Sequence, residues 1–439
     1  NDGRGKGLLV PDEHGQQRAI RAAYLSAGLD PAAVSLLECH ATGTSVGDAT
    51  EIRSSAAVFK NVNSLPIASL KSNLGHLITA AGAAGIIKLI ECMRSQVRPA
   101  SLHVENLTVA LRDSPFRVLQ QAEPWPLAAE QRVRIAAISA FGFGGNNAHL
   151  ILSEDDPERS DAGANAAATK PSEDVVAVVG IGAIAGKAAN RAQLTEAFFS
   201  QGCLRGLDGK GAIAELALEM TGLRFPPRDL AQTLPQQLAI LHAAREALFE
   251  LETAPGSNTA VLIAMEPDAE VARFGTRWRF DTNSVDAQNA VIAPLEAAGV
   301  IGCMPNIPAN RISAQFDFTG PSFTLQSGAE FGASAGTDAG LHAMRIAARA
   351  LHKFEVDAAV VGAVDFCCEP VTAAAGNTDP ADAAVALVLK RLPDAIRDGN
   401  RIYALLEQLP IADASPKQVE NVSDLAAVAA YARTQLGDC

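Results

Sequence analysis

The sequence lacks several features that would place it in a large class of proteins. Basic residues do not predominate, because 36 Lys and Arg stand against 49 Asp and Glu, and the net charge is -13. A general nucleic-acid binder would need a basic surface, although an acidic protein can still carry a local basic patch. We therefore expect no nucleic-acid partner.

Long hydrophobic runs are also missing. The longest, such as DAAVVGAVDF around Val361, are much shorter than the roughly 20 residues that a helix needs to cross a bilayer. The chain does not open with a charged segment followed by an apolar one, which is the pattern of a secretion signal. The sequence predicts no membrane segment, and we expect a cytoplasmic location.

The cysteines form no recognisable framework. There are seven, an odd number, and no two have the Cys-x-x-Cys spacing of a metal or redox site. Scattered, unpaired cysteines are typical of proteins that stay in a reducing compartment. We expect no bound metal.

Two glycine-rich stretches are too imperfect to predict a nucleotide site. Gly180, Gly182 and Gly186 give the spacing GxGxxxG, where a dinucleotide-binding turn has GxGxxG followed by an acidic residue about 20 positions later. The stretch GFGGNN, which begins at Gly142, lacks the Gly-Lys-Ser/Thr ending of a phosphate-binding loop. We expect no nucleotide cofactor.

Helix-like and strand-like runs alternate along most of the chain, and this alternation predicts an α/β fold. In the first part we expect helices at residues 16–29, 47–60 and 80–95, strands at 34–40 and, leading into a loop, at 65–73, and a hairpin at 132–154. In the second part we expect strands at 175–186, 258–265, 318–326, 356–366 and 382–392, and helices at 234–252 and 332–352.

Residues 155–174 separate these two parts. They are rich in Ala, Ser, Asp and Pro and show no apolar periodicity, which predicts a flexible linker. We therefore expect one domain at residues 1–154 and a second, truncated domain at residues 175–439. The chain begins without methionine and ends in TQLGDC, so we expect a fragment of a longer polypeptide.

Three motifs in the first part carry the functional signal. CHATGT begins at Cys39, KSNLGH begins at Lys71, and GFGGNNAH begins at Gly142. In this order they resemble the His-Gly-Thr-Gly-Thr, Lys-Ser-Asn-Leu-Gly-His and Gly-Phe-Gly-Gly-x-Asn-Ala-His motifs of the β-ketoacyl synthases. These are the condensing enzymes of the thiolase superfamily. The double asparagine, Asn146 and Asn147, is most similar to the one in polyunsaturated fatty acid and enediyne-type polyketide synthases.

The resemblance implies a thiolase-like α/β fold with layers in the order αβαβα. Residues 1–154 resemble the C-terminal half of a ketosynthase. Residues 175–439 resemble the N-terminal half of a second copy, as in the tandem ketosynthase–chain length factor region of a polyunsaturated fatty acid synthase or polyketide synthase. The N-terminal half of the first copy, with its nucleophilic cysteine, is then expected before Asn1.

The second copy departs from the family at its nucleophile. Where the family has Thr-Ala-Cys-Ser-Ser, this chain has SGAEF at residues 327–331, and Ala329 stands in the place of the cysteine. A shift of one residue would place Gly328 or Glu330 there, and neither is a nucleophile. The resemblance therefore implies that the second copy catalyses nothing and shapes the length of the acyl chain.

The implied reaction is a decarboxylative Claisen condensation of malonyl-acyl carrier protein with an acyl chain held on an enzyme cysteine. Negative charge develops on the malonyl thioester oxygen, where neutral imidazole N–H groups can stabilise it. By their motif positions, His40 and His76 are the two donors. Lys71 belongs to the same loop as His76 and is implied to order that loop and to tune its charge.

The glycine-rich turn is implied to form a second oxyanion site and a gate, with Phe143 and Gly144 as its residues. Two interpretations stay open for Thr42 and Thr44: they bind the phosphopantetheine arm, or their hydroxyls satisfy the backbone of the turn. The other histidines of this part, such as His103 and His149, are predicted to be structural or surface residues.

The implied cofactor is indirect. No group is expected to bind the chain itself, and the substrates travel on the phosphopantetheine of an acyl carrier protein. The implied partners are that carrier protein, acyl and malonyl thioesters, and the remaining halves of the ketosynthase and chain length factor, paired as in a dimer. Two alternatives are a non-catalytic scaffold of a megasynthase and a coenzyme A-dependent thiolase, whose Gly-His and Cys-Gly arrangement is not seen.

Overall fold

The computed structural model describes residues 1–127, 131–155, 175–200, 202–206, 208–266, 284–292, 296–326, 336–368 and 381–406, with a few isolated positions. Three sequence predictions fall outside these residues: the linker after residue 155, the position of Ala329, and the chain beyond residue 406. In the part that is described, none of the helices combines the length and hydrophobicity needed to span a membrane.

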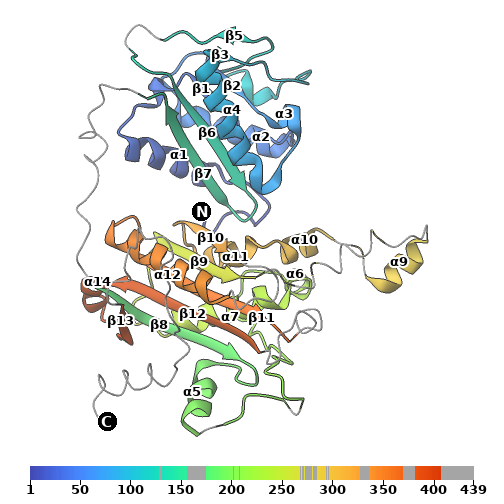
Figure 1. The fold of residues 1–439 in the computed structure, drawn as a ribbon, viewed down its shortest axis with the longest axis vertical. Coiled ribbons are helices and arrows are strands. Elements are labelled where there is room, and N and C mark those ends of the chain that lie inside the picture. Colours follow the sequence, from blue (N-terminus) through green and yellow to red (C-terminus); the bar gives the residue numbers. More distant parts are fainter. Residues whose placement is uncertain are drawn as a thin grey trace. The chain divides into compact units, whose positions relative to one another are not determined.

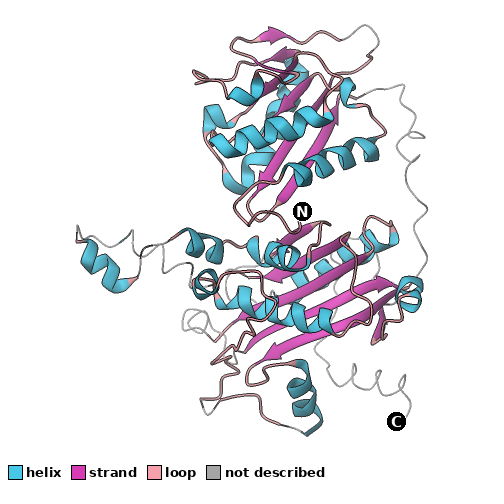
Figure 2. Ribbon diagram, turned by 180° about the vertical axis from the view of Figure 1, so that it is seen from behind, coloured by secondary structure: helices cyan, strands magenta, loops and turns pink. Residues whose placement is uncertain are grey.

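The first region, residues 1–155, is built on a five-stranded sheet with helices on both faces (Figures 1 and 2). The strand order is β4-β2-β1-β6-β7, with β1 at Leu36–Glu38, β2 at Leu65–Ala68, β4 at Phe116–Val118, β6 at Ile135–Gly142 and β7 at Asn146–Ser153. The first four strands are parallel, and β7 returns antiparallel to β6 as the predicted hairpin. Two short strands, β3 at Val97–Arg98 and β5 at Glu123–Pro124, form a separate ribbon.

Helices cover the two faces of this sheet because alternate strand residues point to opposite sides. The helices are α1 at Glu13–Ala27, α2 at Ser45–Val58, α3 at Lys71–Leu74 and α4 at Ala81–Ser95, with 3-10 turns η1 at Pro31–Ala33, η2 at Ile78–Ala80 and η3 at Val109–Leu111. Leu37 of β1 joins a cluster with Ile20 of α1 and Ile52 of α2, whereas its neighbour Leu36 packs with Leu89 of α4.

The second region, residues 175–406, contains a six-stranded sheet. Its order is β10-β9-β11-β12-β8-β13, with β8 at Val176–Ala185, β9 at Thr259–Met265, β10 at Ser322–Leu325, β11 at Ala358–Phe366, β12 at Asp382–Arg391 and β13 at Ala404–Leu406. Strands β10, β9 and β11 are parallel to one another, while β12, β8 and β13 follow as antiparallel neighbours.

Helices also pack on both faces of this sheet, with α7 at Pro235–Phe249 on one face and α12 at Gly336–His352 on the other (Figure 2). The remaining helices are α5 at Arg191–Ser200, α6 at Pro227–Ala231, α9 at Val285–Val291, α10 at Ala297–Cys303, α11 at Ile307–Phe316 and α14 at Leu392–Arg397. Val261 of β9 packs with Ile240 of α7, and its neighbour Leu262 packs with Ala347 of α12. The predicted α/β alternation is confirmed in both regions.

The elements around the motifs differ from the predictions in two places. The strand expected at residues 34–40 ends at Glu38. The N–H of Cys39 still donates to the Ala68 carbonyl of β2, but the N–H groups of His40 and Ala41 donate to a side chain instead of a neighbouring strand. The strand expected at residues 65–73 ends at Ala68, and the loop after it contains one helical turn, α3. Gly75 caps this turn with a φ of 74°, which suits glycine.

The parallel strands of the first region decide where the motifs meet. The carboxyl ends of parallel strands lie on the same edge of a sheet, and loops at this edge are the usual place for a site. CHATGT follows β1, KSNLGH follows β2, and the glycine-rich turn follows β6. Strand order β2-β1-β6 therefore brings the three motifs to one edge.

Candidate active site

His40 is held by backbone hydrogen bonds to a buried acid. The N–H groups of His40 and Ala41 donate to Oε1 and Oε2 of Glu51, at 2.7 and 2.8 Å. Glu51 belongs to α2 and is 3% exposed. Burial raises the pKa of Glu51 to about 7, against the lowering effect of the two N–H donors. Its carboxyl group fixes the direction in which the chain leaves β1, and thereby the ring of His40.

His76 is oriented by its own turn. The N–H of Ile78 donates to Nδ1 of His76 at 3.0 Å. When one ring nitrogen of a neutral imidazole accepts a hydrogen bond, the other carries the proton. In the neutral form of His76, Nε2 is therefore the donor, and this exposed residue can offer its N–H to a bound molecule.

The two predicted donor histidines lie next to each other. The ring centroids of His40 and His76 are 5.6 Å apart with an interplanar angle of 81°. The ring of Phe141, at the end of β6, lies 6.0 Å from that of His40. Burial lowers the pKa of His40 to about 4, and the charges of Lys71 and His76 act in the same direction. His40 is therefore neutral at physiological pH.

Lys71 begins α3 in the loop that also carries His76. Burial lowers its pKa, while the nearby acids Glu38 and Glu51 favour its charged form. Two hydrogen bonds tie the start of this loop to the turn after β1: the N–H of Cys39 donates to the Ala68 carbonyl at 2.7 Å, and the hydroxyl of Ser69 donates to the Ala41 carbonyl at 3.3 Å. The structure brings together the three residues that the motifs predicted as catalytic.

Thr42 and Thr44 lie exposed in the turn between β1 and α2. Their hydroxyl oxygens are 3.2 Å apart, so one donates to the other. The backbone of this turn is held by Asp48, whose Oδ1 accepts from the N–H groups of Thr42 and Gly43 at 3.1 and 3.2 Å. Thr44 stands at the N-cap of α2 without a capping hydrogen bond from its side chain.

The glycine-rich turn connects β6 to β7 and exposes Phe143. The side chain of Phe143 is 52% exposed, and Gly144 and Gly145 have φ angles of 82° and 80°. A Cβ on Gly145 would lie 2.7 Å from the Cβ of Asp2, so neither the backbone angle nor the space admits another residue. The N–H of Gly144 donates to the Leu8 carbonyl at 2.6 Å and is thus occupied.

Two further histidines of the first region, His103 and His149, stand apart from the predicted pair. Nδ1 of His149 is 3.0 Å from the hydroxyl of Ser139, and its ring lies 5.5 Å from that of Tyr24. Burial lowers the pKa of His149 to about 4. His103 lies exposed in a loop. Among the ring contacts of the described residues, neither of these histidines meets the ring of His40.

Sequence reasoning missed a buried charged pair behind the motifs. Glu38, the last residue of β1, is 2% exposed, and its Oε2 lies 2.6 Å from Nζ of Lys88 in α4. The sequence did carry one signal, the glutamate at the end of the apolar run VSLLE. An isolated buried charge is costly, so a glutamate in a buried strand indicates a partner of opposite charge. Its partner stands 50 positions further along the chain and had no signal of its own.

The cysteine beside His40 is not placed to act as a nucleophile. Cys39 is 3% exposed. Burial raises the pKa of its thiol well above the usual value, and the charges of Glu51 and Glu38 add to this. A thiol attacks as its thiolate, so a buried, protonated cysteine is inert.

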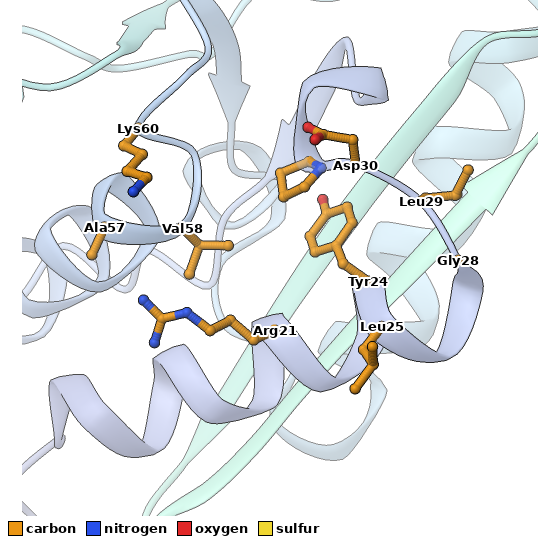
Figure 3. Close-up of a pocket in the computed structure, with 10 residues that line it drawn as sticks. Arg21, Tyr24, Leu25, Gly28, Leu29, Asp30, Ala57, Val58 and Lys60 are labelled. Carbon is orange, nitrogen blue, oxygen red and sulfur yellow. The ribbon is translucent and has the colours of Figure 1, made fainter. Parts of the chain in front are cut away.

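A separate cavity of about 550 Å³ lies between α1 and α2 (Figure 3). It is lined by Arg21, Tyr24, Leu25, Gly28, Leu29, Asp30, Pro31, Ala57, Val58 and Lys60. None of the predicted catalytic residues is among them, so this cavity is not part of the histidine site.

Two histidines and a lysine at the carboxyl edge of a mixed α/β sheet form the arrangement expected of the condensing enzymes. Family models match nearly the whole described chain. Residues 1–105 match the Beta-ketoacyl synthase, C-terminal domain, residues 106–192 match the Ketoacyl-synthetase C-terminal extension, and residues 173–384 match the Beta-ketoacyl synthase, N-terminal domain. The chain therefore belongs to the β-ketoacyl synthase family, and the predicted order of a C-terminal half followed by an N-terminal half is confirmed.

Among curated relatives, the chain is 45% identical over 159 residues to "Polyketide synthase GfsA" of Streptomyces halstedii and 38% identical over 175 residues to "Polyketide synthase PksN" of Bacillus subtilis. It is 42% identical over 163 residues to "Spectinabilin polyketide synthase system protein NorA" of Streptomyces orinoci. These matches cover 35%, 36% and 36% of this chain but only 2%, 3% and 8% of the relatives. The chain thus corresponds to a small part of each relative.

Among solved structures, the chain is similar to "PfaC Keto synthase-Chain length factor", with a TM-score of 0.74 and 24% sequence identity. The similarity covers 89% of this chain and 47% of that one. At this level of identity the similarity speaks for the fold. The predicted thiolase-like fold is confirmed.

Proposed function

We propose that this chain is part of a β-ketoacyl-[acyl carrier protein] synthase within a fatty acid or polyketide megasynthase, and that it contributes the catalytic histidines. The observation that carries this proposal is the pair formed by His40 and His76, whose ring centroids are 5.6 Å apart at one sheet edge. Membership of the β-ketoacyl synthase family supports it, as do the polyketide synthases among the relatives.

The proposed step begins with malonyl-acyl carrier protein. The bond between its carboxylate carbon and Cα breaks, carbon dioxide leaves, and the electron pair passes into an enolate of the thioester. The N–H groups of His40 and His76 donate to the enolate oxygen. The Cα of the enolate then attacks the carbonyl carbon of an acyl chain on an enzyme cysteine, and the cysteine leaves as a thiolate.

The electrostatics of the site suit neutral donors. The lowered pKa of His40 keeps its ring uncharged, and the contact of His76 Nδ1 with the Ile78 N–H leaves Nε2 to donate. Neutral N–H donors that are already in position stabilise developing charge without rearranging during the reaction. In this proposal Lys71 supplies positive charge near the oxygen and orders the loop.

The exposed turn residues have a proposed role in binding the carrier. The hydroxyls of Thr42 and Thr44 lie at the surface beside the histidines and contact the phosphopantetheine arm of the acyl carrier protein. Phe143 gates the cysteine, and its backbone N–H serves the second oxyanion site. Because the N–H of Gly144 already bonds to Leu8, Gly144 contributes through its backbone conformation.

In this proposal the second region acts as a chain length factor. It shares the family fold but carries the sequence SGAEF at residues 327–331, where a condensing copy has a cysteine. It shapes the space for the acyl chain and pairs with a ketosynthase as in a dimer. The proposed division of the chain is residues 1–154, a linker at 155–174, and residues 175–439.

The test uses the full-length synthase and measures carbon dioxide release from malonyl-acyl carrier protein. His76→Ala should lower the rate at least about 100-fold, because loss of one oxyanion donor costs about that much. His103→Ala is the matched control, since it removes an exposed histidine of the same region and should leave the rate unchanged.

Wild-type release by the His76→Ala protein would refute the proposed role of the histidine pair. If the wild-type synthase releases no carbon dioxide and forms no carbon–carbon bond with any malonyl-carrier substrate, the condensing function itself is refuted.

A further inference from the structure

A buried ion pair lies directly behind the histidine site. Oε2 of Glu38 is 2.6 Å from Nζ of Lys88, and the two side chains are only 3% and 12% exposed. Glu38 ends β1, two residues before His40, while Lys88 projects from α4. The pair therefore joins the strand of one histidine to a helix on the opposite side of the sheet from α1 and α2.

The second oxygen of the same carboxylate reaches the other histidine loop. Oε1 of Glu38 accepts from the N–H of Leu70 at 2.5 Å, and Leu70 is the residue directly before Lys71. One carboxylate thus connects the end of β1, the start of the loop that carries Lys71 and His76, and helix α4.

The approach of α4 to this carboxylate depends on a glycine. A Cβ on Gly85 would lie 3.5 Å from Cγ of Glu38 and 2.5 Å from Cδ1 of Ile138. Gly85 stands three positions before Lys88, on the same face of the helix. The missing side chain lets α4 come close enough for the ammonium group to reach the buried acid.

Such a pair is hard to explain by stability alone. Taking two charges out of water costs about as much as their attraction returns, so well-packed apolar residues often serve a fold equally well. The surroundings here are apolar, with Leu36, Leu89 and Ile138 in the adjacent cluster. What apolar residues would not provide is an acceptor for the Leu70 N–H at a fixed point.

We propose that Glu38 is a positioning residue, which holds the loop of Lys71 and His76 in register with His40, and that Lys88 keeps Glu38 in place. This inference rests on the proposed condensing function. Because small misplacements of catalytic groups cost about 100-fold in rate, loosening this loop should slow the histidine-dependent step more than the loading of the cysteine.

The experiment compares two half-reactions of the full-length synthase. One is carbon dioxide release from malonyl-acyl carrier protein, and the other is transfer of an acyl group from its carrier to the enzyme cysteine. The informative variants replace both members of the pair. Glu38→Gln with Lys88→Met removes both charges but keeps an oxygen for the Leu70 N–H, whereas Glu38→Leu with Lys88→Met removes that acceptor as well.

The Gln/Met variant should release carbon dioxide within about fivefold of the wild type, and the Leu/Met variant at least about tenfold more slowly than the Gln/Met variant. Acyl transfer should change less than about threefold in both, and the KM for the malonyl carrier should stay unchanged, so that the loss appears in kcat. Thermal unfolding of the two variants shows whether stability differs between them.

Glu154→Gln is the matched control variant. Glu154 also accepts from a backbone N–H, that of Arg134, at 2.8 Å, and pairs with the Arg134 guanidinium at 2.9 Å, but it touches neither histidine loop. This control should leave both half-reactions unchanged. Equal rates of carbon dioxide release in the Gln/Met and Leu/Met variants, or equal losses in both half-reactions, would overturn the positioning role. A wild-type synthase without either half-reaction would instead overturn the proposed function.

Discussion

The two regions of this chain have the same kind of sheet and different side chains at its edge. Both begin with parallel strands at one end of the sheet and end with antiparallel pairing at the other, which involves only β7 in the first region and β12, β8 and β13 in the second. In the first region, the loops after parallel strands present His40, Lys71 and His76. In the second region, the loop after β11 begins with Cys367 and Cys368. The fold is shared, so the chemistry must be sought in these loops.

At the described end of β11, the two cysteines are hydrogen-bonded to nearby acids. The thiol of Cys367 donates to Oδ2 of Asp365 at 3.0 Å, and the N–H of Cys368 donates to Oδ1 of Asp382 at 3.0 Å. Burial raises the pKa of Cys367 to about 12 and that of Cys368 to about 11, and the acids beside them add to this. Both thiols are protonated at neutral pH, which makes them poor nucleophiles.

Two glutamates, one on a helix of each region, provide the strongest test of the difference between the two sheet edges. Glu51 accepts two backbone N–H groups beside His40, and Glu246 of α7 accepts the N–H groups of Ala183 and Arg191, each at 2.9 Å. Glu51→Ala should lower the free energy of unfolding by about 2–4 kcal/mol, because it leaves two partly buried donors without their acceptors. Glu246 is less buried, so Glu246→Ala should lower the free energy of unfolding by only about 1–2 kcal/mol.

The two glutamate variants should differ more in activity than in stability. Measured in the full-length synthase, carbon dioxide release should fall at least about tenfold for Glu51→Ala, because the backbone that aims His40 loses its support. The Glu246→Ala protein should keep the wild-type rate. Equal rates for the two variants would mean that the edge of the first region holds no histidine site of the proposed kind.

A smaller effect concerns the protonation of His40. Followed by NMR, its ring should titrate with a midpoint near pH 4, because burial lowers its pKa to about 4. A histidine with a lowered pKa binds its proton more readily in the unfolded chain. Its contribution to stability is therefore present above about pH 6.5 and is lost as the pH falls toward 4. The His40→Asn variant identifies the signal, and a midpoint near 6.5 would contradict the buried, neutral ring.

The sequence was sufficient for much of the fold because the informative patterns are local. The hairpin of β6 and β7, the helix α4 and the strand β8 follow from apolar periodicity and a glycine-rich turn, and the structure agrees with each of them. The shortness of β1 was not predictable in this way. It depends on Glu51, which takes the backbone N–H groups of residues 40 and 41 away from the sheet.

In the candidate site, too, the sequence predicted some features and missed others. The motifs named His40, Lys71 and His76, and strand order explains why they meet. The contact of Ile78 with His76 Nδ1 and the link from Glu38 to Lys88 were not named, because they depend on the path of a loop and on the approach of α4. Long-range pairs of this kind leave little trace in a single sequence.

The most direct test of the central claim is carbon dioxide release from malonyl-acyl carrier protein by the full-length synthase with His40→Ala, His76→Ala and both changes together. If the two rings serve one oxygen, each single change should cost about 100-fold or more. The double change should then add less than about tenfold to the slower single variant, because groups that act as a unit are not additive. Release at the wild-type rate by either single variant, or two losses that multiply fully, would contradict the claim.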